Sequence, residues 1–212
     1  MKAFSITIFV LFFVMACQSP KSQVELINHD LEQVIKDYQL YKDHQSPFNQ
    51  DIAGKTNSQL PDLSPKNLKQ QDQALRAIYQ RLTQVDVAKL NRDEAINHAV
   101  LLYTIKNQLD NYTNNEHYMP LTAESGFHVW ISRINRQVSF HTEQDYRDYL
   151  ARLTALPRYF SQQMFWMDKG IEAGITQPQV VLKGFEESIK AFIKEDATSS
   201  TYYQPFLTMP EH

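Results

Sequence analysis

Cysteine and glycine are scarce in this chain. Cys17 is the only cysteine, and 5 of the 212 residues are glycine, against an average usage of about 7 %. Because a single thiol cannot close an internal disulfide, side-chain packing has to supply the stability of the fold. The shortage of glycine, together with many Gln, Leu, Ile and Lys residues, predicts an all-α protein.

The chain also lacks any block of Lys or Arg. It has 21 basic and 24 acidic residues, which give a formal net charge of −3. Proteins that bind nucleic acid gain most of their affinity by neutralising phosphates with clustered basic side chains. A mildly acidic chain without such a cluster is therefore not expected to have a nucleic-acid partner.

Sequence motifs that mark catalytic sites are absent as well. The zinc-helix motif H-E-x-x-H occurs nowhere, and Glu116-His117 is an isolated pair without a second histidine. The chain contains no G-x-S-x-G elbow and no glycine-rich phosphate loop. Glu186-Glu187 is interpreted as a solvated pair on a helix. We therefore assign no catalytic residue, no metal ligand and no cofactor from the residues themselves.

The first seventeen residues have the pattern of a bacterial lipoprotein signal. Lys2 supplies a positive charge, and an apolar run from Ile6 to Met15 follows it. This run of about ten residues is shorter than the about 20 that a membrane-spanning helix needs. Ala16, a small residue, stands directly before Cys17, where a lipoprotein is cleaved and its thiol acylated. The alternatives are an ordinary secretory signal, or an anchor helix with a chance cysteine.

This pattern divides the chain into three parts. Residues 1–16 are predicted to be the signal peptide, 17–23 a lipid tether, and 24–212 one helical domain. Multiple acyl chains hold a protein stably on a bilayer, so the membrane is the expected partner through the lipid on Cys17. Gln18, in place of the Asp that favours inner-membrane retention, indicates the outer membrane, with the body facing the periplasm or the cell surface.

Apolar residues recur at steps of three and four, which predicts about six helices with long irregular connections. Ser22 is expected to cap the first helix, Ser64-Pro65 to start the second, and Asn91 with Glu94 to form a capping box for the third. The expected buried faces are Val24, Ile27, Leu31, Val34, Tyr38 and Tyr41; Leu68, Leu75, Ile78 and Leu82; and Ile96, Ala99, Val100, Tyr103, Leu109 and Tyr112.

The second half of the chain predicts further helices. Thr142 with Asp145 starts one, and Pro157 is expected to end it or to begin the next, because proline removes a helical hydrogen bond. That next helix is expected to close at a glycine, Gly170 or Gly174. The last helix is expected at 176–193, followed by a loop over 196–212.

Two stretches, 43–63 and 113–141, have no helical period and are predicted to be long connections. The second is rich in aromatic, His and Arg side chains, which often line a ligand site in irregular backbone. The candidate residues for a substrate-side wall are Tyr118, Phe127, His128, Trp130, Arg133, Arg136 and His141. The alternative is a loop whose aromatic side chains, including Phe140, fill a helical core. A hydrolytic site around His128 and His141 is the third reading.

The order of several short motifs resembles a known family. Met119-Pro120-Leu121-Thr122, with Gly126-Phe127-His128 behind it, is similar to the N-terminal part of the bacterial domain of unknown function 885 family. The later motifs are Asp145-x-x-x-Tyr149-Leu150-x-Arg152-Leu153-x-x-x-Pro157, Gly170-x-x-x-Gly174, Pro178-x-x-Val181 and Tyr202-x-x-Pro205-Phe206. The resemblance covers roughly residues 25–210.

The resemblance implies a lipid-anchored, mostly helical, zinc-dependent peptidase-like protein, usually about three times longer, with its H-E-x-x-H type motif far downstream. Zinc is thus expected only in full-length members, and no family ligand can be carried over to this sequence. The first hypothesis is that the chain is the N-terminal segment of such a protein, truncated before its catalytic part, inactive alone, and able to contact peptides. The second is a self-contained periplasmic helical binding or interaction lipoprotein.

The aromatic tail separates these two hypotheses. Tyr202, Tyr203 and Phe206 follow the last predicted helix, together with Phe192 near its end. If the chain itself buries these residues, the self-contained module is favoured. If they form a large exposed patch, the segment of a larger fold is favoured, because monomers rarely expose such patches.

Overall fold

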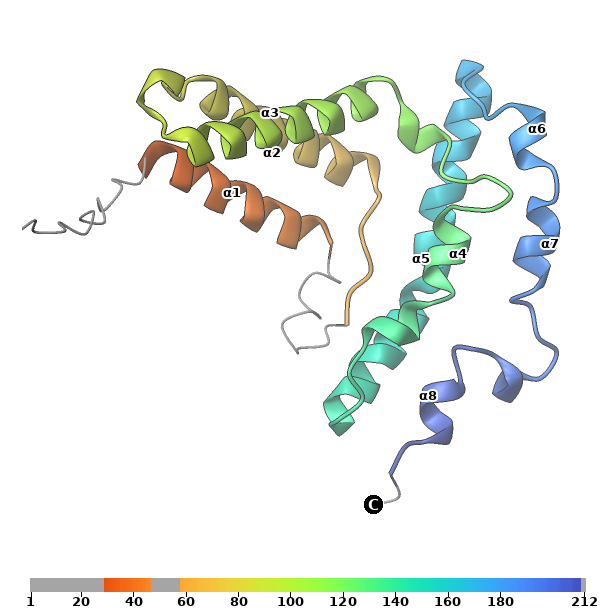
Figure 1. The fold of residues 1–212 in the computed structure, drawn as a ribbon. Coiled ribbons are helices and arrows are strands. Elements are labelled where there is room, and N and C mark those ends of the chain that lie inside the picture. The colour runs from red at the N-terminus through yellow and green to blue at the C-terminus, as the bar shows by residue number, and fades with distance from the viewer. Residues whose placement is uncertain (1–28, 47–57, 211–212) are drawn as a thin grey trace, which may run out of the picture.

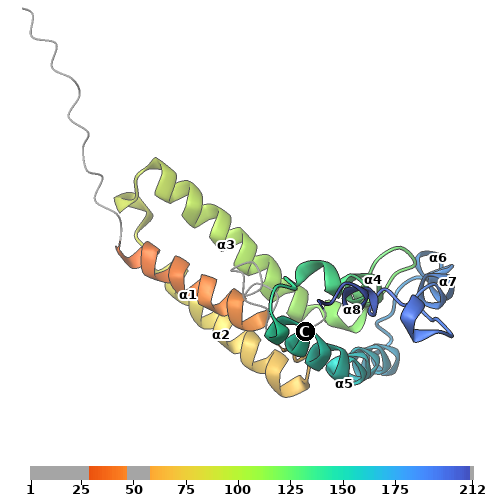
Figure 2. The same cartoon turned by 90° about the horizontal axis from the view of Figure 1, so that it is seen from below.

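The computed structural model describes residues 29–46 and 58–210, and these residues form an all-α structure. The first half is a bundle of three helices that run side by side, as both views show: α1 (His29–Gln45), α2 (Pro65–Thr83) and α3 (Arg92–Thr113) (Figures 1 and 2). A short 3-10 helix, η2 (Val87–Lys89), lies between α2 and α3. The predicted cap Ser22 and the residues 24–28 lie outside the described part of the chain, as does most of the predicted loop 43–63.

The second half is organised around one long helix, α5 (Glu143–Ala173). Four short helices accompany it: α4 (Phe127–Ile131), α6 (Gln179–Leu182), α7 (Phe185–Lys190) and α8 (Gln204–Leu207) (Figure 1). The connections carry the 3-10 helices η3 (Glu116–Tyr118), η4 (Ile134–Gln137) and η5 (Ala197–Ser199). Within the described residues there is no β-strand, and the β-type pairing is a single bridge between Leu121 and Gly126.

Each half has its own apolar core. The first core consists of Leu31, Val34, Tyr38, Leu75, Ile78, Leu82, Val85, Ile105 and Leu109. The second consists of Leu60, Ile131, Ile134, Tyr149 and Tyr159. Leu60 belongs to the second core although it precedes α2, because the segment before α2 is fastened to α5. Arg158 donates to the Leu60 carbonyl at 3.2 Å, and Trp166 Nε1 donates to the Leu63 carbonyl at 2.7 Å.

The predicted helix starts at Ser64, Asn91 and Thr142 are confirmed, whereas the start expected at 176 is wrong because α6 begins at Gln179. Ser64 accepts a hydrogen bond from the Asn67 amide, and Pro65 occupies the first turn of α2. Asn91 and Glu94 form a complete capping box at the start of α3. Such side chains satisfy the amide groups that a helix start leaves without helical partners. The same box, from Thr142 and Asp145, starts α5, and α5 ends at Gly174, which adopts a left-handed φ of 69°.

The predicted buried face of α3 is wrong in the first half of the helix and confirmed at Leu109, which is buried. Ile96, Val100 and Tyr103 are exposed, whereas His98 and Ile105 are buried in their place. His98 belongs inside because its Nε2 pairs with the Leu82 carbonyl at 2.9 Å, so the ring keeps a polar partner while it packs between α2 and α3. A hydrophobicity pattern alone cannot reveal such a partner. A prediction based on it therefore places the apolar residues of the helix inside and the histidine outside.

The predicted break at Pro157 is also wrong, because α5 continues through this proline. Proline costs an interior helix about 3 kcal/mol. The neighbouring turns are held by tertiary contacts: Tyr149 and Tyr159 are in the second core on either side of Pro157. Their burial offsets the local cost and keeps the two parts of α5 in line.

The last predicted helix, at 176–193, is divided instead. Gly184 adopts a φ of 93°, which separates α6 from α7. This left-handed conformation suits glycine and is incompatible with a continuous α-helix. Val181 and Phe185 therefore do not share one helical face.

The tail at 196–210 packs back onto α5. Tyr149 Oη donates to the Tyr202 carbonyl at 3.0 Å, and Phe206 lies against the rings of Tyr146 and Tyr149. Tyr203 remains exposed. The expected loop instead contains the short helices η5 and α8, and Tyr202 and Phe206 pack against the second core.

The described helices include none that combines the length and the apolar character required to cross a membrane.

Stability is expected to depend on the first core. Leu82 is 0 % exposed and Leu40 is 58 % exposed, so the pair offers a chemically matched comparison. We expect Leu82→Ala to lower the free energy of unfolding by about 2–5 kcal/mol through cavity formation, and Leu40→Ala to lower it by about 0.5 kcal/mol or less. Urea unfolding followed by circular dichroism measures both. Equal losses would contradict the assignment of this core.

Candidate functional site

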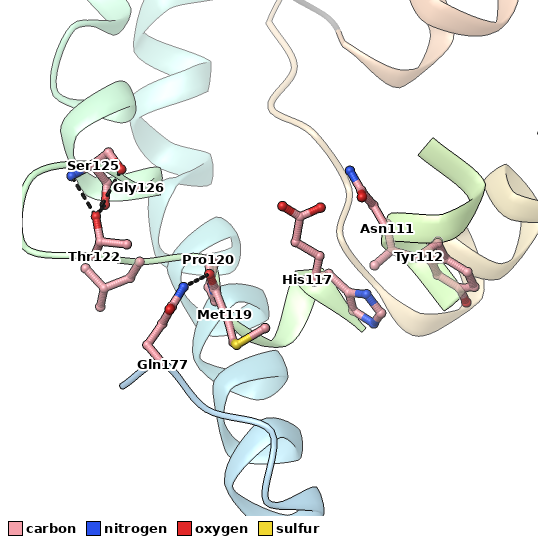
Figure 3. Close-up of a pocket in the computed structure, with 12 residues that line it drawn as sticks. Asn111, Tyr112, His117, Met119, Pro120, Thr122, Ser125, Gly126 and Gln177 are labelled. Atoms are coloured by element: carbon pink, nitrogen blue, oxygen red, sulfur yellow. Dashed lines mark hydrogen bonds between the residues drawn. The ribbon is translucent and has the colours of Figure 1, made fainter. Parts of the chain in front are cut away.

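The candidate site lies where the chain passes from α3 to α4, at the junction of the two halves (Figure 3). Asn115 turns the chain with a left-handed φ of 58°, and η3 then leads into the segment 119–126. Gly126 is required at the end of this segment. It has a φ of 138°, and a Cβ there would lie 2.7 Å from the Pro120 carbonyl oxygen. The Ala123 amide donates to the Val181 carbonyl at 2.8 Å, which fastens the segment to α6.

A pocket opens on each side of this segment. The first has a volume of about 540 Å³ and is lined by Leu68, Asn111, Tyr112, Glu116, His117, Met119, Pro120, Leu121, Thr122, Ser125, Gly126 and Gln177 (Figure 3). The second has a volume of about 380 Å³ and is lined by Tyr118, Met119, Pro120, Leu121, Met164, Met167, Asp168, Ile171, Thr176, Gln177, Leu182 and Phe185. Residues 119–121 and Gln177 therefore border both pockets.

The second pocket, which we call the methionine groove, is the more apolar of the two. Three methionines line it, and Asp168 is its one charged side chain. Unbranched methionine side chains adapt to differently shaped apolar partners. The groove therefore suits apolar side chains of a ligand, while the Gln177 amide, which donates to the Met119 carbonyl at 3.5 Å, sits at its polar border.

An aromatic cluster holds the segment between the two halves. The His117 ring stacks on Tyr112 of α3 at 5.2 Å and meets Trp166 of α5 edge-on at 4.5 Å between ring centroids. Tyr118 stacks on Trp166 at 5.7 Å. Gly170 permits this approach, because a Cβ there would lie 3.1 Å from the Tyr118 Cβ. The bundle and α5 thus hold the wall of both pockets in place.

Burial lowers the pKa of His117 below its ordinary value. Its Nδ1 is buried and has no hydrogen-bond partner among the described residues. The neutral ring is therefore the favoured form near pH 7, because protonation would place a charge among aromatic side chains. In this state His117 serves as a packing surface rather than as a cation.

His128 is a structural connection between α4 and α7. Its side chain is 4 % exposed, and its Nε2 lies 2.9 Å from the Ser188 hydroxyl, which donates to the Phe185 carbonyl at 2.7 Å. Burial also lowers the pKa of His128. His141, the other histidine of the hydrolytic reading, is exposed at the start of α5, at the end that contacts α8.

The structure therefore disperses the predicted wall. Of its members, Tyr118 lines a pocket. Phe127 packs against Tyr159 and Phe160, as the core-filling alternative expected, and Phe140 lies against Tyr149. Those left exposed in whole or part are Trp130, Arg133, Arg136 and His141.

The residues that sequence reasoning missed come from distant segments. His117 has no second histidine in register, so the sequence motif does not single it out, and the sequence analysis assigns no site role to Met164, Met167 and Ile171. Their spacing of three and four along α5 was a usable signal for one shared face. Their opposition to Met119 needed the three-dimensional structure.

The described residues do not bring together three His, Cys, Asp or Glu side chains in a way that could hold a metal ion. With no H-E-x-x-H motif in the sequence, the residues present do not fit a zinc ion, and we derive no catalytic step through one.

Fold and site together define an all-α protein with a two-sided pocket between a helical bundle and a long helix. The chain belongs to the family described as bacterial protein of unknown function (DUF885), whose model matches residues 47–212. This match confirms the family expected from the ordered motifs. No curated protein and no solved structure matches the chain.

The burial of His117 predicts a pH dependence of stability. Its folded pKa lies below the ordinary value near 6.5, so the unfolded chain binds the proton more readily as the pH falls. The stabilising contribution is complete above about pH 6.5 and is lost as the pH drops toward the folded pKa. Between about pH 7 and pH 5, the window around the ordinary pKa of histidine, we expect the free energy of unfolding to fall with pH in both proteins. The fall should be less steep in the His117→Gln variant than in the unchanged chain.

Urea unfolding at a series of pH values measures this slope. His141→Gln is the matched control, because His141 is exposed and its replacement should leave the slope unchanged. Identical slopes in the His117→Gln variant and the unchanged chain would contradict the prediction.

Proposed function

We propose that this protein is a lipid-anchored component of the bacterial envelope whose helical body binds peptides in the methionine groove. The observation that carries the proposal is the groove itself, in which Met119, Met164 and Met167 surround an apolar space of about 380 Å³. Membership of a bacterial family and the leader pattern at residues 1–17 support the envelope location.

The shape of the groove favours a peptide over a small polar ligand. Its lining is mostly apolar, and backbone carbonyl and side-chain amide groups border it near Met119 and Gln177. Apolar pockets for alternate side chains beside polar backbone groups are the usual means of recognising a peptide. The adjoining 540 Å³ pocket shares the wall at residues 119–121, so one ligand could extend across both.

The resemblance to zinc peptidase-like proteins suggests the same class of ligand. Because no residue set in the described chain fits zinc, we assign the chain a binding role and no hydrolytic step. On the first hypothesis, in which the chain is the N-terminal segment of a larger peptidase-like protein, the groove forms the substrate-side wall of that protein.

The second hypothesis, a self-contained binding lipoprotein, gains from the tail. Tyr202 and Phe206 are partly buried against the second core, whereas Tyr203 is exposed, so part of the burial that this hypothesis expects is present. Ile171 of α5 and Val180 of α6 are exposed, and such exposed apolar side chains favour the hypothesis of a larger fold. Both hypotheses share the groove and its peptide ligand.

Peptide binding is expected to respond to charge in the groove. Met164 is 52 % exposed and lines the groove, whereas Met209 is 38 % exposed and lies outside it. We expect Met164→Glu to weaken the binding of an apolar peptide by roughly tenfold, since an unpaired carboxylate beside Asp168 is unfavourable. Met209→Glu should leave binding unchanged.

Fluorescence anisotropy with a labelled peptide mixture measures the affinity, and zinc content and peptide cleavage are recorded on the same preparation. We expect binding without cleavage. Equal affinities in the two variants would contradict the groove, and stoichiometric zinc with hydrolysis would contradict the assigned binding role.

Anchoring is expected to depend on the thiol of Cys17. Growth of an expressing Gram-negative host with a labelled fatty acid should label the unchanged chain, and Cys17→Ser should abolish the label and cleavage before residue 17. Replacement of Ser22 by Ala serves as the neighbouring control. Label that persists in the Cys17→Ser variant would contradict lipidation at this residue.

A further inference from the structure

The outward face of α3 carries an apolar stripe that no described residue covers. It consists of Ile96, Val100 and Tyr103, which are 51, 60 and 75 % exposed. Steps of four and three place these residues on one face of a helix. The opposite face of α3 packs in the first core, so the stripe belongs to a helix that is apolar on both sides.

α3 begins at the end of the bundle where α1 begins (Figures 1 and 2), and the stripe lies in the first half of α3. Asp30 and Val34 near the start of α1 share a hollow with Arg81 in the last turn of α2 and with Val85 just after it. From there η2 leads directly into α3, and its Val87 is exposed as well. The first half of α3 is therefore close to the residue at which the chain emerges from its tether.

The tether brings this end of the bundle to the membrane. Cys17 lies about 12 residues before His29, and an extended chain spans at most about 3.6 Å per residue, or roughly 40 Å. A lipid on Cys17 therefore keeps the start of α1 within that distance of the bilayer. Contact of a nearby surface with the bilayer is then intramolecular, so a patch too small to bind a membrane by itself is sufficient.

From this geometry we infer that the stripe Ile96, Val100 and Tyr103 rests on the lipid bilayer. The inference rests on the proposed lipid anchor. Apolar side chains with a tyrosine among them suit the membrane–water interface, where the ring is buried and its hydroxyl stays hydrated. Beside the stripe, Lys89 and Arg92 are balanced by Asp86 and Asp93, so the contact depends little on anionic lipid.

The contact also orients the candidate site. The last turn of α3 carries Asn111 and Tyr112, which line the 540 Å³ pocket. With about 1.5 Å of rise per residue, this turn lies roughly 17 Å along the helix from the centre of the stripe. A contact through the stripe therefore lies to one side of the pocket residues and does not cover them.

A single labelled thiol tests the inference. In the mature acylated chain Cys17 is blocked, so Val100→Cys supplies the one thiol that an environment-sensitive dye can modify. Val180→Cys is the matched control, because Val180 is 78 % exposed and lies on α6. Both variants are reconstituted as full acylated chains in vesicles of phosphatidylethanolamine and phosphatidylglycerol that contain a lipid-borne quencher, and acylation is confirmed by mass.

We expect quenching at position 100 to exceed quenching at position 180 by roughly threefold, and to persist in vesicles without phosphatidylglycerol. Adding Tyr103→Asn to the Val100→Cys variant should reduce it. Equal quenching at the two positions in acylated protein would overturn the inference and leave the anchor intact. Absence of acylation by mass would overturn the anchor and the inference together.

Discussion

The packing of His117 between Tyr112 and Trp166 is the contact on which the rest of the structure depends. It joins the last turn of α3, the helix that contributes to the first core, to α5, the long helix that contributes to the second core. Without it the two cores would be connected mainly by the segment before α2. Because the ring is buried, its neutral form is favoured. The contact between α3 and α5 is therefore most stable when His117 is unprotonated.

This joint also forms the site. The chain that leaves His117 becomes the wall shared by both pockets, and its fixed points are Gly126, which closes on the Pro120 carbonyl, and Ala123, which bonds to α6. The methionine groove lies between α5, which contributes Met164, Met167 and Ile171, and the 119–121 segment.

Helix α3 has apolar residues on two different surfaces. Its buried face builds the bundle, its last turn reaches the pockets, and its exposed stripe faces away from the first core. The stripe and the pocket residues Asn111 and Tyr112 thus occupy different parts of the same helix. The arrangement gives one physical reason why apolar residues occupy both faces of the same helix.

The sequence by itself determined the fold class, the family and most helix starts. Capping residues such as Asn91 and Thr142 act on amides within one turn, so their effect is local and readable. The face of α3, the continuation of α5 through Pro157, and the site could not be read in this way. Each depends on a partner distant in sequence: His98 on the Leu82 carbonyl, α5 on the second core, and Tyr118 on Trp166. Local chemistry decided where helices begin, and only tertiary packing decided which sides they bury and where the pockets open.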